Sequence, residues 1–272
     1  MRRPGAVWTA AALAVASVLA VPSAVVLASL ARPAREVWVH LWRTQLLEVL
    51  GNTLALVAGV GVGTLLVGGG LAWLVVTYRF PGARVFEWAL ILPLAMPGYV
   101  IAFVYTVLLQ FVGPVQTWLR DLTEARSLGR SRLAAFREVT LPMARPSLVA
   151  GVSLAMMEAL ADIGTVATFG YRTLTESVYR VWYGMFDRAA AAQLASLLLL
   201  FALGMLALER GLRGRARFVQ SQRRGAGIAP VRLRGGRAGA ASAACAAVLG
   251  LAFALPVAQL LAWAGGALGG WR

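Results

Sequence analysis

Long apolar runs are the feature that most constrains what this sequence can fold into. Six runs cover residues 6–30, 52–77, 85–111, 147–168, 189–208 and 238–264. A helix of about 20 such residues spans the hydrocarbon core of a bilayer. A soluble domain is about 45–50% apolar and about 25% charged, whereas this chain is 60% apolar and 14% charged. The sequence therefore predicts an all-α fold, a polytopic membrane helix bundle with about six apolar helices.

The first apolar run follows two arginines, a layout shared with secretory signals. Because five further runs follow, a retained membrane anchor is the better interpretation. The short stretch behind this run, with His40 between Trp38 and Trp42, is expected to form an amphipathic surface helix. Residues 1–50 are therefore predicted to be an N-terminal anchor helix with an amphipathic segment.

The sequence lacks the side chains that several kinds of catalysis need. All 26 cationic residues are Arg and none is Lys. This excludes P-loop NTPases and Schiff-base enzymes, because both need a Lys. One histidine, His40, and one cysteine, Cys245, cannot form a His/Cys metal cluster or an intramolecular disulfide. The chain is therefore expected to be no enzyme and to need no cofactor or metal.

The net charge of +15 comes largely from Arg residues in short stretches between the apolar runs. This distribution is typical of the cytoplasmic loops of membrane proteins. It favours anionic lipids as partners, and no nucleic acid is expected because no base-reading module is recognisable. Nine Arg residues lie between Arg210 and Arg237, so residues 209–237 are predicted to be a basic cytoplasmic linker that acts as a flexible tether.

The distribution of Arg leaves two topologies open. With a cytoplasmic N-terminus and six crossings, 18 of the 26 Arg residues would face outward, contrary to the positive-inside rule. The rule is satisfied if the N-terminus lies outside and all six runs cross. It is also satisfied if the N-terminus lies inside and one crossing is absent between residues 111 and 123.

Two prolines, Pro93 and Pro97, lie four residues apart in the third apolar run. Each removes a backbone donor and clashes one turn back, so the helix is expected to kink or break there. Broken helices at membrane depth are tolerated where they line a cavity or are buried in protein. Pro93, Pro97 and the following Tyr99 are therefore candidates for the wall of a translocation pathway. A kinked packing helix is the alternative.

Two carboxylates, Glu158 and Asp162, lie four residues apart in the fourth run and are predicted to share one helix face. An isolated carboxylate at bilayer depth costs about 2.5–3.5 kcal/mol, so such residues usually face a cavity or a partner. They form a second set of pathway candidates. The alternative is a structural pair, satisfied by a neighbouring Arg or by helix caps.

Aromatic residues and arginines alternate after the fourth run. Tyr171, Tyr179, Trp182 and Tyr183 are expected to lie in an external loop. An interfacial aromatic belt is the favoured interpretation, and contact with a solute-binding protein is the alternative.

Residues 123–146 form a polar, Arg-rich stretch immediately before the fourth run. Leu133, Phe136 and Val139 recur at helical spacing and give the stretch a short apolar side. Pro142 and Pro146 are expected to end this surface helix and to begin the next span. Such a helix suits docking into a groove of a partner protein. A connector that lies among lipid headgroups is the alternative.

The spacing within this stretch is specific. Gly129 is followed, after nine residues, by Val139-Thr140-Leu141-Pro142. This resembles the EAA loop of binding-protein-dependent ABC importer permeases, whose pattern is Glu-Ala-Ala, three residues, Gly, nine residues, Ile, one residue, Leu-Pro. Other stretches look like ferric-iron-type permeases of that family: Asn52-Thr53-Leu54, 92–100, 113–118 and 157–166.

The resemblance implies a role for this stretch and a set of partners. In the family the EAA loop is a cytoplasmic coupling helix that sits in a cleft of the ATPase. The positions implied to couple here are Glu124, Ala125, Gly129, Phe136, Val139, Leu141 and Pro142. The implied partners are an ABC ATPase subunit, a periplasmic or extracellular solute-binding protein, and a second permease half or homodimer mate. The implied location is the bacterial inner membrane, as a multi-pass protein.

The sequence departs from the family pattern in three places. Glu124 is displaced by one position from the family's acidic residue. The family has another crossing just upstream of the loop, so residues 51–208 are expected to be a type-1 permease transmembrane domain with one crossing missing near 112–122. Residues 238–272 are expected to be the first helix of a truncated second half.

The predicted function is that of a transmembrane permease subunit of an ABC importer for ferric iron, with ATP hydrolysis in a separate subunit. One alternative is a gradient-driven secondary transporter that uses Glu158 and Asp162 as a proton relay. Another is an inactive truncated permease fragment. The spacing from Gly129 to Pro142 favours the ABC importer over the gradient-driven carrier, because a gradient-driven carrier needs no helix that docks on an ATPase.

Overall fold

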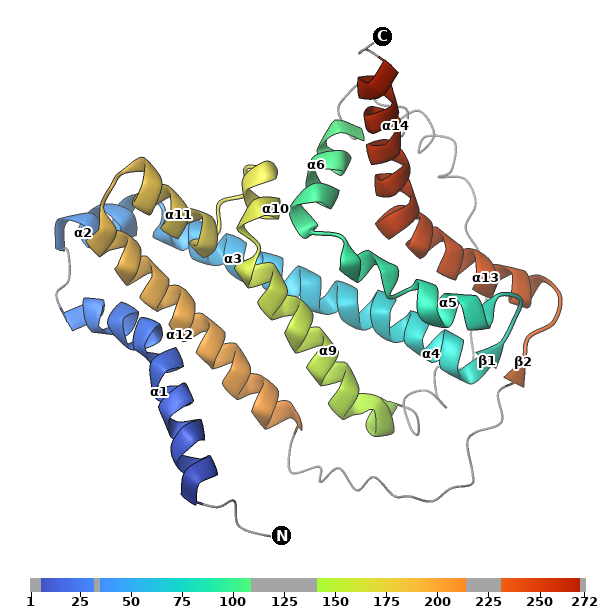
Figure 1. Ribbon diagram of the computed structural model, residues 1–272, viewed down its shortest axis with the longest axis horizontal. Helices are drawn as coiled ribbons and strands as arrows, with labels where there is room; N and C mark the ends of the chain where they lie inside the picture. The colour runs from blue at the N-terminus through green and yellow to red at the C-terminus, as the bar shows by residue number, and fades with distance from the viewer. Residues whose placement is uncertain (1–5, 32–34, 109–140, 214–230, 270–272) are drawn as a thin grey trace.

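The computed structural model describes residues 6–31, 35–108, 141–213 and 231–269. These residues are helical apart from short turns and one pair of two-residue strands (Figure 1). Within them, four helices are long and apolar enough to span a membrane, and a bent helix pair makes a fifth candidate. The prediction of an all-α, polytopic membrane fold is confirmed.

One helical rod of 32 residues, Leu46–Thr77, runs through the centre of the bundle (Figure 1). Its three parts are α3 (Leu46–Gly63), the π-helical turn η2 (Thr64–Gly68) and α4 (Gly69–Thr77). Beside it lies α9 (Leu141–Ala161). Gly61 faces Met156 and Gly69 faces Leu148, which shows that α9 runs in the opposite direction. A Cβ at Gly61 would lie 2.9 Å from the sulfur of Met156, so this glycine lets the two helices approach closely.

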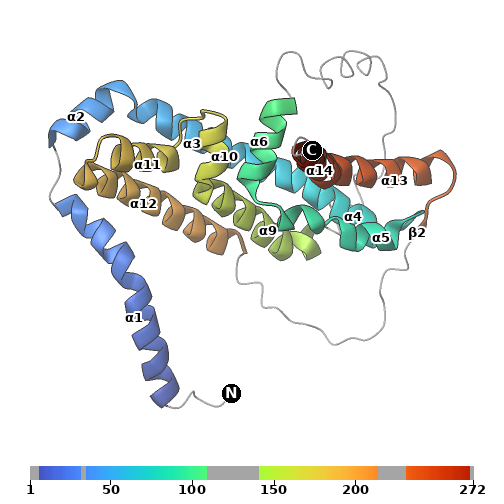
Figure 2. The same ribbon diagram turned by 45° about the horizontal axis from the view of Figure 1, so that its top comes forward.

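The N-terminal helix α1 (Ala6–Ala28) touches the bundle only near its end. There the hydroxyl of Ser196, on α12 (Arg188–Arg213), donates a hydrogen bond of 2.6 Å to the carbonyl of Val26. The rest of α1 projects away from the other helices (Figure 2), and none of its spanning window is buried.

The short helix η1 (Ser29–Ala31) ends the first span, and α2 (Arg35–Thr44) follows after three residues outside the described part. Trp38 of α2 donates its indole N–H to the side-chain oxygen of Gln193, which ties α2 to the start of α12. The amphipathic helix that was predicted around His40 is confirmed.

Two predicted spans are interrupted. The third run forms α5 (Ala83–Ala89), the 3₁₀ turn η3 (Leu92–Ala95) and α6 (Gly98–Leu108), with a bend of 91° between Ala95 and Gly98. The fourth run ends as a helix at Ala161, and α10 (Ile163–Thr168) and α11 (Leu174–Gly184) follow. The break at residues 93–97 confirms the prediction from the two prolines, whereas a continuous span over 147–168 is wrong.

The last span packs against the broken third run. It consists of α13 (Gly236–Leu249), the π-helical turn η5 (Gly250–Ala254) and α14 (Leu255–Gly269). The hydroxyl of Tyr105 on α6 donates a hydrogen bond to the carbonyl of Leu251. In a π-helical turn that carbonyl would accept from residue 256, and Pro256 has no N–H to give. Tyr105 therefore satisfies a carbonyl that a proline leaves open.

A strand pair joins two segments that are far apart in the sequence. In this pair β1 (Tyr78–Arg79) lies parallel to β2 (Val231–Arg232). The hydroxyl of Ser242 adds a hydrogen bond of 2.7 Å to the carbonyl of Pro81. Residues 231–237 of the predicted linker are thus bound to the bundle, and residues 209–213 are the last turns of α12. The prediction of a flexible tether is wrong at these residues.

The helix directions give the bundle two distinct ends. One end holds the last turns of α4 and α12, the first turn of α9 and the strand pair. We call it the Arg-rich end, since its arginines include Arg79, Arg84, Arg210 and Arg232. At the other end, the latch end, α3 and α12 begin and α9 finishes. The start of α1 points away from the latch end (Figures 1 and 2). The two topologies that the Arg distribution leaves open stay predictions.

Candidate functional site

The break in the third run is produced by its two prolines. The amide of Met96 donates to the carbonyl of Pro93 at 3.1 Å, which closes the short 3₁₀ turn η3. Met96 itself is extended, with φ −100° and ψ 124°. Helical hydrogen bonding resumes when the amide of Val100 donates to the carbonyl of Pro97 at 3.0 Å. Pro97 therefore lies immediately before α6 as its N-cap residue, where a proline costs no hydrogen bond.

The break in the fourth run is produced by Asp162. Its backbone amide still donates to the carbonyl of Glu158 at 3.0 Å, but its ψ of 90° ends the helix. The amide of Thr165 donates to Asp162 Oδ1 at 3.0 Å, and the hydroxyl of Thr165 donates to Oδ2. Asp162 is thus the N-cap of α10, a position at which an aspartate stabilises a helix.

The two breaks lie against each other at the latch end, where α6 contacts α10. A Cβ at Gly98 would overlap Oδ2 of Asp162 and lie 3.0 Å from the hydroxyl oxygen of Thr165. A Cβ at Gly164 would lie 2.5 Å from Cβ of Tyr99. Both glycines are therefore required for this close approach, and we call the contact of residues 96–99 with 162–165 the junction.

The junction gathers some of the predicted pathway residues and leaves others outside. Pro97, Tyr99 and Asp162 belong to it, and Tyr99 is 55% exposed. Pro93 lies half-buried in η3, before the junction. Glu158 is exposed one turn earlier on α9, whereas the half-buried carboxylate of Asp162 turns forward to Thr165. The predicted common face of the two carboxylates is therefore interrupted by the end of the helix, and a pathway role for these residues stays a prediction.

A set of hydrogen bonds, those of Thr53 buried, fastens α3 to the segment between α10 and α11. The hydroxyl of Thr53, which is 1% exposed, accepts from the amide of Leu174 at 2.9 Å and donates to the carbonyl of Val49. The side chain of Asn52 donates to the carbonyl of Arg172 at 3.0 Å. We call these contacts the latch. Sequence reasoning noted Asn52 and Thr53 only for their resemblance to the family and missed their structural role.

Most of the aromatic stretch after the junction is helical, because Tyr179, Trp182 and Tyr183 lie on α11 and Tyr171 precedes it. Its external position stays a prediction. Thr173 caps α11 by accepting from the amide of Glu176 at 3.3 Å. The signal in the sequence was the Thr-x-x-Glu spacing of a capping box. The ring centroids of Tyr179 and Tyr183 lie 4.6 Å apart on the outer face of the helix. Whether these rings form an interfacial belt or contact a partner stays open.

Most of the residues implied to couple with an ATPase lie outside the described residues: Glu124, Ala125, Gly129, Phe136 and Val139. So does the segment 112–122, where a crossing is predicted to be missing. Leu141 and Pro142 are the first two residues of α9, at the Arg-rich end. Within the described residues the apolar part of α9, Ser147–Ala161, is shorter than a membrane-spanning helix. A span that begins at Pro142 therefore stays a prediction, as does the coupling role.

Groups that could hold a metal are not found in the part of the chain that the structure describes, where no three His, Cys, Asp or Glu side chains gather. The polar groups of the junction and the latch bond mainly to backbone atoms and to one another. The site therefore consists of helix breaks, small residues and one carboxylate.

Together, these features define an all-α, multi-pass membrane protein in which two broken helices meet. Known proteins similar to this chain are permeases of ABC transport systems. The chain is 27% identical over 199 residues to "Fe(3+)-transport system permease protein FbpB 2" of Haemophilus influenzae, a match that covers 64% of this chain and 39% of that protein.

Two further relatives carry other substrates in their names. "Sulfate transport system permease protein CysT" of Salmonella typhimurium is 28% identical over 193 residues, 53% of this chain and 70% of that protein. "Molybdate/tungstate transport system permease protein WtpB" of Thermococcus kodakarensis is 25% identical over 244 residues, 79% of this chain and 99% of that protein. No family model and no solved structure matches the chain. The relatives agree on a permease and differ in substrate.

Proposed function

We propose that this chain is the permease subunit of an ABC importer, that it forms part of the translocation path, and that its substrate is ferric iron. ATP hydrolysis belongs to a separate subunit in this proposal. The relatives support the permease role. The ferric-iron relative, together with the stretches that resemble ferric-iron-type permeases, favours iron over sulfate and molybdate.

One observation carries the proposal: α9 links the two places that an importer has to connect. The spacing from Gly129 to Pro142 leads directly into the first turn of α9 at the Arg-rich end. The same helix ends at Ala161, next to the N-cap Asp162 of the junction. A rigid helix between a docking segment and a pair of broken helices is a physical route by which ATPase movement reaches the path.

The two ends of the bundle then have separate partners in the proposal. The positive-inside rule puts the Arg-rich end in the cytoplasm, where the ATPase docks. The latch end faces outward, where a solute-binding protein delivers the substrate. A second permease half or a homodimer mate completes the path, because α1 exposes nearly its whole length.

The docking step is tested by replacing Gly129 with Trp in the chain reconstituted with its ATPase. We expect ATP hydrolysis to continue while uptake falls, since a bulky side chain at the predicted helix start separates the two subunits. Ser131→Trp is the matched control, because the helical pattern places Ser131 away from the apolar side. An unchanged ratio of uptake to ATP hydrolysis in Gly129→Trp contradicts the coupling role.

The transport mechanism and the substrate are tested in the same vesicles. We expect uptake of radioactive ferric iron that depends on ATP, and no comparable uptake of sulfate or molybdate. Uptake that persists without ATP and stops when the proton gradient is removed supports a gradient-driven carrier instead. An absence of uptake from a chain that co-purifies with no ATPase supports the inactive fragment.

A further inference from the structure

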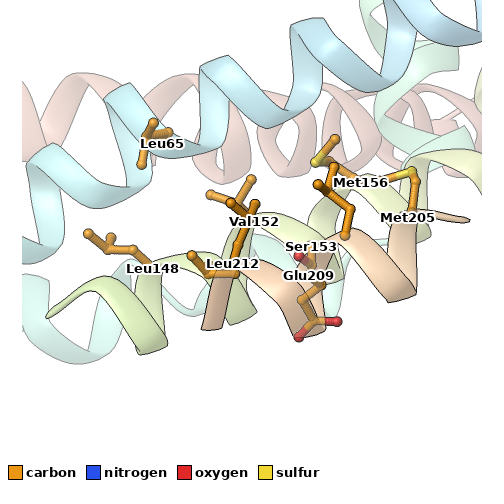
Figure 3. A pocket seen from close by; sticks show the side chains of 10 residues that line it. Leu65, Leu148, Val152, Ser153, Met156, Met205, Glu209 and Leu212 are labelled. Atoms are coloured by element: carbon orange, nitrogen blue, oxygen red, sulfur yellow. The ribbon is translucent and has the colours of Figure 1, made fainter. Parts of the chain in front are cut away.

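A large apolar cavity lies between η2, α9 and α12 in the half of the bundle toward the Arg-rich end (Figure 3). Its volume is about 590 Å³. The lining side chains are Leu65, Leu148, Val149, Val152, Ser153, Met156, Met205, Leu208, Glu209 and Leu212. The junction and the latch do not include any of these residues, so the cavity is a separate feature.

The cavity exists because the helices that surround it do not close over it. Met156 packs on Gly61 and Leu148 packs on Gly69, so α9 is held to the central rod at two points. Leu65 lies between these points, in the π-helical turn η2, and is 45% exposed. Leu208 on α12 is 61% exposed. Apolar side chains thus line a space that opens toward the membrane.

Water is a poor occupant for this space. A buried water molecule needs two to four polar partners. Ser153 and Glu209 are the polar side chains of the lining, and the carboxylate of Glu209 points away from Leu65 and Leu148 (Figure 3). An empty cavity of this size would lose the dispersion contacts of all its lining atoms. The occupant is therefore expected to be apolar.

The size and the depth of the cavity fit one lipid chain. At about 30 Å³ for a water-sized group, the cavity holds roughly twenty such groups, comparable with the methylenes of one membrane acyl chain. The cavity extends to the last turns of α12, where Arg210 and Arg213 follow the lining residues Glu209 and Leu212 in the sequence. A basic edge beside an apolar cavity on the cytoplasmic side is complementary to an anionic lipid headgroup.

We infer that this cavity is a binding site for an anionic phospholipid of the cytoplasmic leaflet, with one acyl chain between α9 and α12 and the headgroup phosphate beside Arg210. The lipid fills the space that separates α9 from α12 and holds the two helices at a fixed distance. This inference does not depend on the transported substrate.

The test uses the full chain in nanodiscs that contain phosphatidylglycerol with a photoreactive diazirine in the middle of one acyl chain. After irradiation, peptide mass spectrometry is expected to find the adducts concentrated on the cavity residues Val152, Met156 and Met205. The variant Val152→Trp fills the cavity and is expected to lower labelling of Met205 about tenfold. Leu154→Trp is the matched control on the same helix, because Leu154 is 68% exposed and does not line the cavity.

A second variant separates headgroup recognition from chain binding. Arg210→Gln is expected to reduce the preference for phosphatidylglycerol over phosphatidylcholine about fivefold, which corresponds to about 1 kcal/mol, while acyl-chain labelling of the cavity persists. Thermal unfolding and size-exclusion profiles identify misfolded variants, and Met205→Phe provides a smaller filling substitution if Val152→Trp misfolds.

Three results would overturn the inference. One is labelling of the cavity residues no stronger than labelling of Leu154. Another is labelling of the cavity residue Met156, which both filling variants retain, that neither variant reduces. The third is a change of oligomeric state in the filling variants with unchanged lipid labelling, which would identify a helix of a second copy as the occupant.

Discussion

The two ends of α12 differ sharply although they belong to one helix. At the latch end Leu194 is 1% exposed and packs with Leu46 and Val181. Toward the Arg-rich end, each residue that the structure describes from Leu197 to Leu212 is at least partly exposed, and Leu208 lines the cavity. The same apolar composition is thus packed by protein at one end and left for lipid at the other. An apolar sequence predicts that a segment lies in the membrane. Whether its side chains pack against protein depends on which neighbouring helices are present.

The largest expected effect comes from testing this difference on α12 itself. Leu194→Ala removes a fully packed side chain and is expected to lower the free energy of unfolding by about 3 kcal/mol. Leu208→Ala is the matched control at the Arg-rich end, with an expected change within about 0.5 kcal/mol. Denaturation of the purified variants in one detergent measures both. Equal losses would show that the cavity end is as well packed as the latch end.

The junction gives the next largest effect. Gly98→Ala places a methyl group against the carboxylate of Asp162 and is expected to lower the free energy of unfolding by about 2 kcal/mol. Gly59→Ala on α3 is the control, because a Cβ there meets nothing within 4 Å. It is expected to be neutral or stabilising, since Ala favours helix more than Gly. Thermal unfolding compares the two. A stable Gly98→Ala protein would mean that the two broken helices separate readily.

The latch is tested by an isosteric change. Thr53→Val keeps the shape and leaves the buried amide of Leu174 without its acceptor, so we expect a loss of about 1 kcal/mol. Thr44→Val is the control, because the exposed Thr44 hydroxyl bonds only to the carbonyl of His40 in its own helix. Hydrogen exchange at Leu174 is expected to accelerate in Thr53→Val alone. Unchanged exchange would show that other contacts hold the latch end together.

Asp162→Asn gives the smallest effect on stability and sharpens the role of the junction. Asn is as good an N-cap as Asp, so the free energy of unfolding is expected to change by less than about 0.5 kcal/mol. If the carboxylate also lines the path, uptake is expected to fall about tenfold, which corresponds to a free-energy difference of about 1.4 kcal/mol. Membrane yield and uptake are measured together. Unchanged uptake in Asp162→Asn, with an unfolding loss of about 1 kcal/mol in Asp162→Ala, would show that the residue is only a cap.

Sequence reasoning succeeded where local chemistry decides the structure. The membrane fold follows from the apolar runs, and the break at Pro93 and Pro97 follows from the missing amides. The end of α9 at Asp162 was missed, because residues 147–168 were treated as one continuous span, although helix caps were among the alternatives considered for the two carboxylates. The Thr173 cap of α11 was missed although its spacing to Glu176 is visible in the sequence.

Contacts between distant segments were beyond the reach of the sequence alone. The meeting of Gly98 with Asp162 depends on the angle of a helix break, and a proline predicts a break without its direction. The latch depends on which face of α3 meets α11. The pairing of β1 with β2 involves only two residues on each strand, too few for a pattern of alternation to be recognised.

That strand pairing has a consequence for the order of events during synthesis. About 150 residues separate Arg79 from its partner Arg232, and α13, which covers the turn after β1, comes later still. At about 5–20 residues per second, the turn is in the membrane for roughly 10 to 30 seconds before its partner leaves the ribosome. During that interval Tyr78 and Phe80 lack the helix that buries them in the finished protein. The nascent chain therefore offers a long-lived target for membrane chaperones and proteases at this turn.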